Sequence, residues 1–453
     1  MSAAVTEKRP PGPPMRKGVV GSLRYYAAFA IDPIGFVAGR FRQYGDLYFT
    51  PTKDGGLYVL KHPDHMREVL VTRASSFTKE HTAFTMLQRV LGEGLLTTDG
   101  DAWTRQRRMV QPAFAPSRMA GYAHVMTEES RRTSASWKSG GNRDMTEEMT
   151  SLTLRIVGRT LFGHDVPEAD IQAIGRAMDA FQRSLTGAEL LPEWLPTPGR
   201  RELDRSLHKL NAIIHGLIAA RQSKPSAEPR SDLLEMLVTA VDVEGRGGSL
   251  SVKEVRDQLV TLFLAGHETT SNALTWTWAL LAKNPACERA LHAELDAVLG
   301  DRAPELADLE RLPYTEQVIA EAMRLYPPIY VIARRASEDT EVGGYPVPRG
   351  AEVILWVYMA HRDPRFFPDP EAFRPERFTR EAAAQLPKLA YLPFGGGPRA
   401  CIGKTFAMME ARLILATLAQ RHRVALAPGQ SLDVRPRITL TPKRGMKMIV
   451  SRR

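Results

Sequence analysis

The segment FGGGPRACIG, from Phe394 to Gly403, contains one of only two cysteines in a chain of 453 residues. Its three consecutive glycines permit tight turns and a close approach of the backbone to a flat or bulky group. A helical apolar pattern follows Cys401, so we expect the thiol at a helix N-terminus, where the helix dipole stabilises a thiolate. Such a thiolate is a metal ligand or a nucleophile; the structural alternative is an inert buried cysteine.

Composition narrows the class of protein. Two cysteines, Cys287 and Cys401, cannot make a disulfide framework, which favours a reducing compartment and predicts a cytoplasmic protein. The net charge of +10 favours acidic partners. No Lys/Arg run of five or more and no zinc-finger spacing occurs, so we do not expect nucleic acid binding. No secretory signal and no apolar stretch of roughly 18 residues is present, so we expect no integral membrane anchor.

Helical periodicity dominates the chain. Residues 147–163 and 204–221 both show apolar side chains at helical spacing. Short strand-like runs occur near Tyr58, near Ile354 and in MKMIV at the end of the chain. The sequence therefore predicts a mainly α fold with a minor β region, whose sheet combines early and late parts of the chain.

One helix is expected to be unusually long. Ser251 and Glu254 have the spacing of a capping box, and Pro285 closes the other end, about 30 residues or roughly 45 Å away. Residues 259–265 are almost wholly apolar, which predicts burial on all sides. A helix of this kind crosses the centre of one large domain. We therefore expect a single domain over residues 21–453. The proline-rich segment RPPGPP at 9–14 cannot be helical, so we expect residues 1–20 to form an extended lead-in to that domain.

The motif AGHETT, residues 265–270, lies midway along this helix. One glycine and two threonines are poor helix formers, and a buried His–Glu pair is costly unless it is used. A zinc protease motif needs a second histidine at the fifth position, where this chain has Ser271. That class is excluded, while a core kink with satisfied hydroxyls remains the structural alternative.

The segment around Cys401 resembles the haem-binding loop of the cytochrome P450 family, in which Phe, Gly, a basic residue and Cys recur at this spacing. The resemblance covers nearly the whole chain and implies the family's single triangular-prism fold, with the haem between the long central helix and the cysteine loop. It implies that Cys401 is the axial ligand of a haem b iron and that Phe394 packs against its sulfur. It also assigns Arg399 to a haem propionate and Gly403 to the cofactor site.

Other motifs match the same family in order and spacing. Glu321, Arg324 and Arg377 match its buried Glu–Arg–Arg set, which we interpret as structural support for the haem pocket. His361, in HRDP, is also assigned a structural role, because Cys401 already holds the axial position. These residues are not expected to be catalytic.

Three further residues match the family's haem-propionate partners. Trp103 and Arg107 lie one helical turn apart in WTRQR, and Arg334 matches when counted back from the GG turn. Arg335 is adjacent, so the last assignment can shift by one residue.

The resemblance also gives AGHETT a catalytic interpretation. Ala265 and Gly266 would flank the haem and leave room for dioxygen. Glu268 and Thr269 would relay the two protons that O–O cleavage requires. The implied reaction is insertion of one atom of dioxygen into an apolar organic substrate by hydroxylation or epoxidation.

The resemblance implies that electrons come one at a time from a separate partner, since we expect no fused flavin or iron–sulfur domain within these 453 residues. We expect a ferredoxin or flavodoxin with its reductase, drawing on NAD(P)H, and a monomeric oxygenase. Lys404, Arg412, Arg105 and Arg108 are expected to steer an acidic partner. The alternatives are a haem-thiolate isomerase or peroxygenase, or a non-catalytic haem protein that binds a ligand; the Glu268–Thr269 pair argues against the last.

The sequence predicts the chemical character of the substrate rather than its identity. The candidates for a substrate pocket are all apolar, which predicts an apolar substrate such as a fatty acid, terpenoid, steroid or macrocycle; they are Phe84, Leu87, Leu95, Phe263, Ile329 and Val331.

Overall fold

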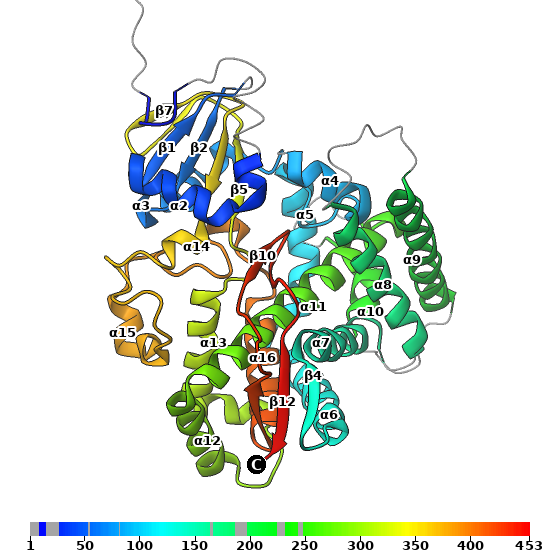
Figure 1. Cartoon of the computed structure of the whole chain (residues 1–453). Helices are drawn as coiled ribbons and strands as arrows, with labels where there is room; N and C mark the ends of the chain where they lie inside the picture. Colours follow the sequence, from blue (N-terminus) through cyan, green and yellow to red (C-terminus); the bar gives the residue numbers. More distant parts are fainter. Residues whose placement is uncertain are drawn as a thin grey trace, which may run out of the picture. The chain divides into compact units, whose positions relative to one another are not determined.

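The computed structural model describes residues 9–14, 27–52, 55–80, 82–163, 166–185, 197–223, 232–242 and 248–453 (Figure 1). Within the predicted lead-in, only residues 9–14 belong to this set. They form no regular secondary structure, as a proline-rich segment requires. The carbonyl of Pro11 accepts a hydrogen bond from the backbone N–H of Phe49 at 3.0 Å, so this segment lies against the first strand.

Contacts divide the chain into two compact units whose segments alternate along the sequence. Unit 1 comprises residues 1–85, 324–373 and 380–401, and unit 2 comprises residues 86–323, 374–379 and 402–453. The prediction of a single domain over 21–453 stays a prediction.

Unit 1 is built around a sheet with the strand order β1-β2-β8-β5-β3. β2 and β8 pair in parallel, from Leu57 opposite Glu352 to Leu60 opposite Leu355, and the other neighbours are antiparallel. Early strands therefore lie beside late strands, as the sequence predicted (Figure 1). The strands of the unit are β1 (Leu47–Thr50), β2 (Leu57–Leu60), β3 (Phe77–Thr78), β5 (Ile332–Ala336), β6 (Thr340–Val342), β7 (Tyr345–Val347) and β8 (Glu352–Leu355).

Short helices accompany this sheet. The strand-like run near Ile354 is a strand only as far as Leu355, because a short helix begins at Val357. The helical elements are α2 (Pro33–Tyr44), α3 (Pro63–Arg67), the π-helical turn η1 (Glu68–Thr72), η2 (Ala74–Ser76), α14 (Val357–Ala360), α15 (Arg380–Gln385) and η6 (Gly397–Arg399); α4 (Thr82–Leu91) begins here and ends in unit 2.

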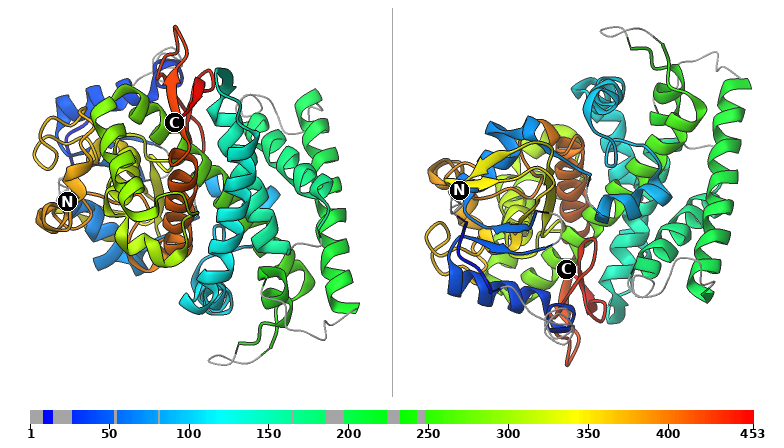
Figure 2. Two further views of the ribbon diagram at one scale, coloured as in Figure 1. Left: turned by 90° about the horizontal axis from the view of Figure 1, so that it is seen from below. Right: turned by 90° about the horizontal axis from the view of Figure 1, so that it is seen from above.

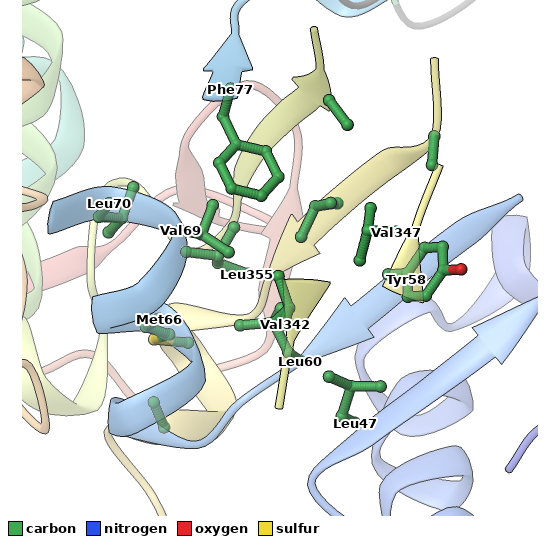
Figure 3. Close-up of a cluster of buried hydrophobic side chains, with 14 of the residues drawn as sticks. Leu47, Tyr58, Leu60, Met66, Val69, Leu70, Phe77, Val342, Val347 and Leu355 are labelled. Carbon is green, nitrogen blue, oxygen red and sulfur yellow. The ribbon is translucent and has the colours of Figure 1, made fainter. Parts of the chain in front are cut away.

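The main apolar core of unit 1 lies between one face of the sheet and the helical turns that follow β2 (Figure 3). Leu60, Val353 and Leu355 are fully buried in this core. The burial of aliphatic side chains on both the early and the late strands holds the two parts of the chain together. Figure 3 draws this cluster, with labels on Leu47, Tyr58, Leu60, Met66, Val69, Leu70, Phe77, Val342, Val347 and Leu355.

Unit 2 is mainly helical. Its helices are α5 (Gly100–Val110), η3 (Gln111–Phe114), α6 (Pro116–Ser136), α7 (Met145–Phe162), α8 (Glu168–Leu185), α9 (Pro198–Ser223), α10 (Leu233–Thr239), α11 (Val252–Lys283), α12 (Pro285–Leu299), η4 (Leu306–Arg311), α13 (Pro313–Leu325, whose last turn enters unit 1), η5 (Pro375–Phe378) and α16 (Lys404–Ala419). The helices predicted at 147–163 and 204–221 are α7 and part of α9. α8 and α9 pack side by side (Figure 2).

α11 is the long helix that the sequence predicted. Ser251 and Glu254 form the capping box: the Ser251 N–H donates to the Glu254 carboxylate at 2.8 Å, and the Glu254 N–H donates to the Ser251 hydroxyl at 3.2 Å. Pro285 opens the next helix, α12. Side chains from Leu259 to Leu264 are buried, but Ala265 is exposed, so the expectation of burial on all sides fails at that residue.

The strands of unit 2 come from the end of the chain, with one exception. β12 (Lys447–Arg452) pairs with β9 (His422–Leu426) and with the early strand β4 (Gly141–Asp144). β10 (Val434–Pro436) and β11 (Leu440–Pro442) form a separate hairpin. Among the described helices, none combines the length and apolar character required to cross a bilayer.

Candidate active site

The cysteine loop of unit 1 is closed by its own backbone. The N–H of Cys401 donates to the carbonyl of Phe394 at 2.9 Å, and a single 3₁₀ turn, η6, occupies the space between them. Cys401 is exposed and forms no disulfide. α16 begins at Lys404 with Gly403 as its N-cap, so the thiol lies three residues before the first helical residue rather than on the helix itself.

Gly397 explains why the loop contains glycine. Its φ is +66°, a conformation that L side chains rarely adopt. A Cβ at this position would lie 1.7 Å from the carbonyl oxygen of Leu70, at the π-helical turn η1. Gly395 also has a positive φ, of +69°. The loop can therefore reach this position against η1 only without a side chain at residue 397.

His361 supports the segment that leads into the loop. Its side chain is fully buried, and its Nε2 accepts a hydrogen bond from the backbone N–H of Leu392 at 2.9 Å. Because Nε2 accepts, the proton of the neutral ring is assigned to Nδ1. The contact agrees with the structural role that the sequence assigned to this histidine.

Arg334 and Arg335 lie on opposite faces of β5, because successive side chains of a strand alternate. Arg334 is buried and shares its face with Ile332, which a Cβ at Gly395 of the cysteine loop would meet at 4.0 Å. Arg335 donates instead to the carbonyl of Gly350 at 3.1 Å. The geometry favours Arg334 over its neighbour as the cation on the side of the cysteine loop.

The acid of the expected Glu–Arg–Arg set lies within unit 2. Glu321 is fully buried, and its carboxylate accepts the backbone N–H of Arg374 at 2.9 Å. The guanidinium of Arg377 lies 3.3 Å from the same oxygen. The acid therefore binds both the backbone and a side chain of the segment at 374–377.

Arg324 makes a different set of contacts, within unit 1. Its fully buried guanidinium donates to three carbonyls, those of His361 at 2.9 Å, Pro370 at 2.7 Å and Ala372 at 3.1 Å, and it stacks on the ring of Phe367. Arg324 thus holds the long loop between α14 and η5 through its backbone. Its support of the haem pocket stays a prediction.

The middle of α11 has one open stretch. Ala265 is exposed and Thr269 is partly exposed, although the helix around them is buried. The hydroxyl of Thr269 donates to the Ala265 carbonyl at 2.6 Å. Gly266 has a packing role as well, because a Cβ there would lie 3.1 Å from the Val157 side chain of α7. The small residues therefore leave open surface at Ala265 and allow close helix packing at Gly266.

His267 belongs to the core. It is buried, its ring centroid lies 5.4 Å from that of Phe263 with the two rings tilted by 49°, and its Nδ1 lies 2.9 Å from the carbonyl of that residue. Burial lowers the pKa of His267, so the neutral ring is favoured. In the buried His–Glu pair, His267 therefore packs in the core as a neutral ring. Glu268 is the member of the pair that can hold and release a proton near neutral pH.

Glu268 is a buried acid with one short hydrogen bond. Its carboxylate accepts from the hydroxyl of Thr439 at 2.5 Å. Burial raises the pKa of Glu268 to about 7, although the Thr439 hydroxyl and the charge of Arg437 oppose the rise. An acid with this pKa is partly protonated at neutral pH, which suits a proton donor.

Trp103 and Arg107 lie on α5, one helical turn apart, and both are partly buried. Their neighbours Arg105 and Arg108 were expected to steer a redox partner, but both are engaged within unit 2. Arg105 pairs with Glu254 at 2.6 Å and Arg108 with Asp242 at 3.2 Å.

Arg412 is engaged in the same way. It pairs with Glu316 at 2.7 Å and donates to the carbonyl of Leu309. Lys404, the fourth expected steering cation, is exposed at the start of α16. The expectation of four steering cations is therefore reduced to Lys404, because the arginines hold elements of unit 2 together.

The predicted substrate residues differ in their packing. Phe263 is fully buried and lies 6.0 Å from the ring of Phe162 in α7, so it belongs to the interhelical core. Val331 packs on the face of the sheet that carries Trp356. Neither position supports a role in lining a pocket. Phe84 and Ile329 are partly buried, while Leu87 and Leu95 are buried.

Sequence reasoning missed three polar residues near this part of α11. Asn272 and Thr439 form a hydrogen-bonded set with Glu268, and Glu410 is a fully buried acid on α16. Asn272 and Glu410 occur on helices at buried positions, which is a weak signal for function. The hydroxyl of Thr439 carried no sequence signal at all.

The comparisons with known proteins agree with this geometry. The sequence profile of the family described as cytochrome P450 matches residues 10–449. Cyclooctatin synthase of Streptomyces melanosporofaciens is 40% identical over 91% of this chain and 90% of its own length. Cyclooctat-9-en-7-ol 5-monooxygenase of the same organism is 35% identical over 94% of both chains. The crystal structure of the cytochrome P450DA heme domain superimposes with a TM-score of 0.87 at 28% identity, over 99% and 98% of the two chains.

The fold and the cysteine loop define a haem-thiolate oxygenase of the cytochrome P450 class. This chain belongs to the cytochrome P450 family and is a monooxygenase. Residues that suit a haem occur in both units, each taken by itself. Unit 1 has an exposed thiol on a glycine loop and a buried arginine on the adjoining sheet face, and unit 2 has exposed surface at Ala265 of α11. Within the described residues, no three His, Cys, Asp or Glu side chains gather as ligands for another metal ion.

Proposed function

We propose that Cys401 supplies the axial thiolate of a haem b. When bound, that group supplies the activation of dioxygen. The observation that carries this assignment is the exposed thiol on a loop whose approach to η1 only glycine allows. The other residues proposed to contact the haem are Phe394, Arg399, Gly403, Arg334, Trp103, Arg107, Ala265 and Gly266.

We propose that Glu268 and Thr269 deliver protons during the reaction. The pKa of Glu268, raised to about 7, allows its buried carboxyl to hold a proton at neutral pH and to release it. The hydroxyl of Thr269 can both accept and donate a hydrogen bond, so it can pass a proton on once it leaves the Ala265 carbonyl. Glu268 is the proposed donor, and Thr269 is the proposed carrier.

We propose a cyclic terpenoid with few polar groups as the substrate. Two relatives carry names that refer to cyclooctatin and to cyclooctat-9-en-7-ol, and the second name specifies a monooxygenase acting at position 5. The apolar character of Leu87, Leu95 and Ile329 agrees with such a molecule. The proposed reaction is hydroxylation or epoxidation of this substrate.

We propose that electrons reach the protein from NAD(P)H through a reductase and a ferredoxin or flavodoxin. The exposed ammonium of Lys404 suits an acidic partner of this kind. We propose that the oxygenase is a monomer and acts in the cytoplasm.

The axial ligand is tested by the absorption spectrum of the reduced protein with carbon monoxide. We expect the strongly red-shifted band of a thiolate-ligated haem in the wild type and its loss in Cys401→Ser. Cys287→Ser is the matched control, because this second cysteine lies on α12 and should leave the band unchanged. A Cys401→Ser protein that keeps the band would exclude the assignment.

The substrate class is tested by titration of the oxidised protein with cyclic terpene alcohols and, in parallel, with fatty acids of equal carbon number. A substrate that binds beside the haem would change its absorption spectrum, so binding is observed without turnover. We expect the terpenoids to bind at lower concentration than the fatty acids. The reverse order would contradict the proposed class and leave the cytochrome P450 assignment intact.

A further inference from the structure

Three side chains of α11 form a polar stripe toward the β10–β11 hairpin. Glu268, Asn272 and Trp276 follow one another at intervals of four residues, so they lie on the same face of the helix. Asn272 Nδ2 donates to the Thr439 hydroxyl at 3.1 Å, and Trp276 Nε1 donates to the Leu440 carbonyl at 3.2 Å. Together with the bond from Thr439 to Glu268, these contacts attach the hairpin to the helix.

The direction of the hydrogen bonds is fixed by chemistry. The amide nitrogen of Asn272 can only donate, so the oxygen of Thr439 accepts that bond. The hydroxyl proton of Thr439 is then available for the ionised carboxylate of Glu268, which can only accept. Thr439 and Asn272 are almost fully buried, at 2% and 3% exposure, so water does not replace either bond readily.

The backbone around Thr439 is constrained as well. Pro436 pairs with Leu440 in the hairpin, and the N–H of Arg437 donates to the carbonyl of Thr439 at 3.1 Å. Thr439 therefore belongs to a tight turn whose strands flank it directly. Its hydroxyl is held in place by the turn from one side and by Asn272 from the other.

We propose that Thr439 is a positioning residue for Glu268: the hairpin hydroxyl, oriented by Asn272, fixes the proton-donating carboxyl and sets how readily it ionises. This inference rests on the role proposed above for Glu268. It adds a residue from the end of the chain to the proton-delivery apparatus of the helix. Any displacement of the hairpin from α11 would remove the hydroxyl from the carboxyl.

The charges that face Glu268 support this inference. Burial raises the pKa of the acid, and the negative charge of Asp179 on α8 acts in the same direction. The Thr439 hydroxyl is the larger of the two opposing contributions, and the positive charge of Arg437 is the smaller. Loss of the hydroxyl therefore leaves burial largely unopposed and raises the pKa further.

The proposal is tested by infrared difference titration of the protonated-carboxyl stretching band between about pH 5 and 10, beyond the usual range of surface carboxyls. Glu268 and Glu410 are the described acids whose pKa values are raised to about 7 and about 8. The titration is performed in an E410Q background to isolate Glu268, and E268Q identifies its band. The haem-containing protein is used throughout, without substrate.

The Thr439→Val variant keeps the shape of the side chain and removes the hydroxyl. We expect the midpoint of the Glu268 band to rise by about one to two pH units, which is the effect of losing one hydrogen bond to a charged group. Thr439→Ser should restore the wild-type midpoint. Thr441→Val is the matched control. Thr441 lies in the same hairpin, and the hydrogen bond described for its hydroxyl goes to the Arg435 carbonyl and not to Glu268.

Asn272→Leu provides a second test if Thr439→Val does not give a cooperatively folded protein. It keeps the Thr439 hydroxyl but removes the group that orients it, so we expect a smaller rise of the midpoint. An unchanged midpoint in the folded variants, or an equal shift in Thr441→Val, would overturn the proposal. Failure of the haem-thiolate assignment would appear separately, as loss of the red-shifted carbon monoxide band from the wild type.

Discussion

The α-carbon of Gly397 lies directly against the carbonyl oxygen of Leu70, so closely that a Cβ would stand 1.7 Å from that oxygen. The contact joins the cysteine loop to the π-helical turn η1 within unit 1. We expect Gly397→Ala to displace the loop and to abolish or strongly reduce haem retention. The absorption spectrum measures this effect as the molar ratio of bound haem to folded protein.

Gly344→Ala is the control for this substitution. Gly344 also has a positive φ, of +76°, but no atom lies within 4 Å of a Cβ at that position. Its cost should be limited to backbone strain of about 1–2 kcal/mol, with normal haem content. Equal haem loss in the two variants would show that strain alone, and not the contact with Leu70, is responsible.

The hydrogen bond from Leu392 to His361 gives a second prediction. His361→Leu leaves the Leu392 N–H without its acceptor in a buried site, which should lower the free energy of unfolding by about 1–3 kcal/mol. His361→Gln offers a replacement oxygen acceptor and should recover part of the loss. Denaturant unfolding of the two variants measures this difference; equal stabilities would argue that only the volume of the ring matters.

The pKa of Glu268 predicts a pH dependence of coupling, the share of consumed electrons that ends in product. Because burial raises this pKa from 4.5 to about 7, the carboxyl holds its proton below that pH and loses it above. Coupling should therefore fall, and peroxide release should rise, as the pH increases through about 7. Glu268→Gln cannot lose a proton in this range, so its lower coupling should not depend on pH there.

Glu410 predicts a pH dependence of stability. It is fully buried on α16, and among the described residues neither of its carboxylate oxygens has a partner in hydrogen-bond geometry. Burial raises its pKa to about 8, although the nearby Thr270 hydroxyl opposes the rise, so the folded state retains a proton that the unfolded state loses near pH 4.5. The stability from this neutral carboxyl is complete below about pH 4.5 and is lost as the pH rises to about 8.

Glu410→Gln removes this titration. We expect the free energy of unfolding of the variant, relative to the wild type, to increase from pH 5 to pH 8, by at most about 5 kcal/mol. Denaturant titrations at both pH values provide the test. A difference between the two proteins that stays constant with pH would mean that Glu410 ionises normally in the folded state.

The contrast between Lys404 and Arg412 gives a prediction for electron transfer. Lys404→Glu should slow reduction by an acidic ferredoxin roughly threefold to tenfold at low salt, without a change in stability. Arg412→Glu should instead lower the free energy of unfolding by about 3 kcal/mol, because it breaks the contacts with Glu316 and Leu309. Stopped-flow reduction and thermal unfolding separate the two effects; an unaltered reduction rate in Lys404→Glu would exclude it from the partner surface.

The features that the sequence predicted well are those with a local signature. The capping box at Ser251 and Glu254, the length of α11 and the glycine loop before Cys401 all depend on residues close together in the chain. The combination of early and late strands in one sheet was also predicted, from short β-rich runs at the two ends.

The features that were missed depend on contacts across long sequence separations. The Thr439 hydroxyl that binds Glu268 lies 171 positions away, and nothing in the sequence around either residue specifies that contact. The expectation that Arg105 and Arg412 steer a redox partner has a related weakness. Both arginines form ion pairs with acids of unit 2 that are distant in the sequence, and their local sequence does not indicate these partners. Phe263 and Val331 are apolar in either a core or a pocket, so hydrophobicity could not distinguish the two.

The parallel pairing of β2 with β8 has a consequence for biosynthesis. The hairpin of β1 and β2 leaves the ribosome early, but its neighbour in the sheet begins only at Glu352. An isolated two-stranded hairpin is marginally stable at best, so the nascent sheet must wait for nearly 300 further residues. During that interval, the edge of β2 is open to chaperones or to wrong pairing, and a truncated chain that ends before β8 should aggregate rather than fold.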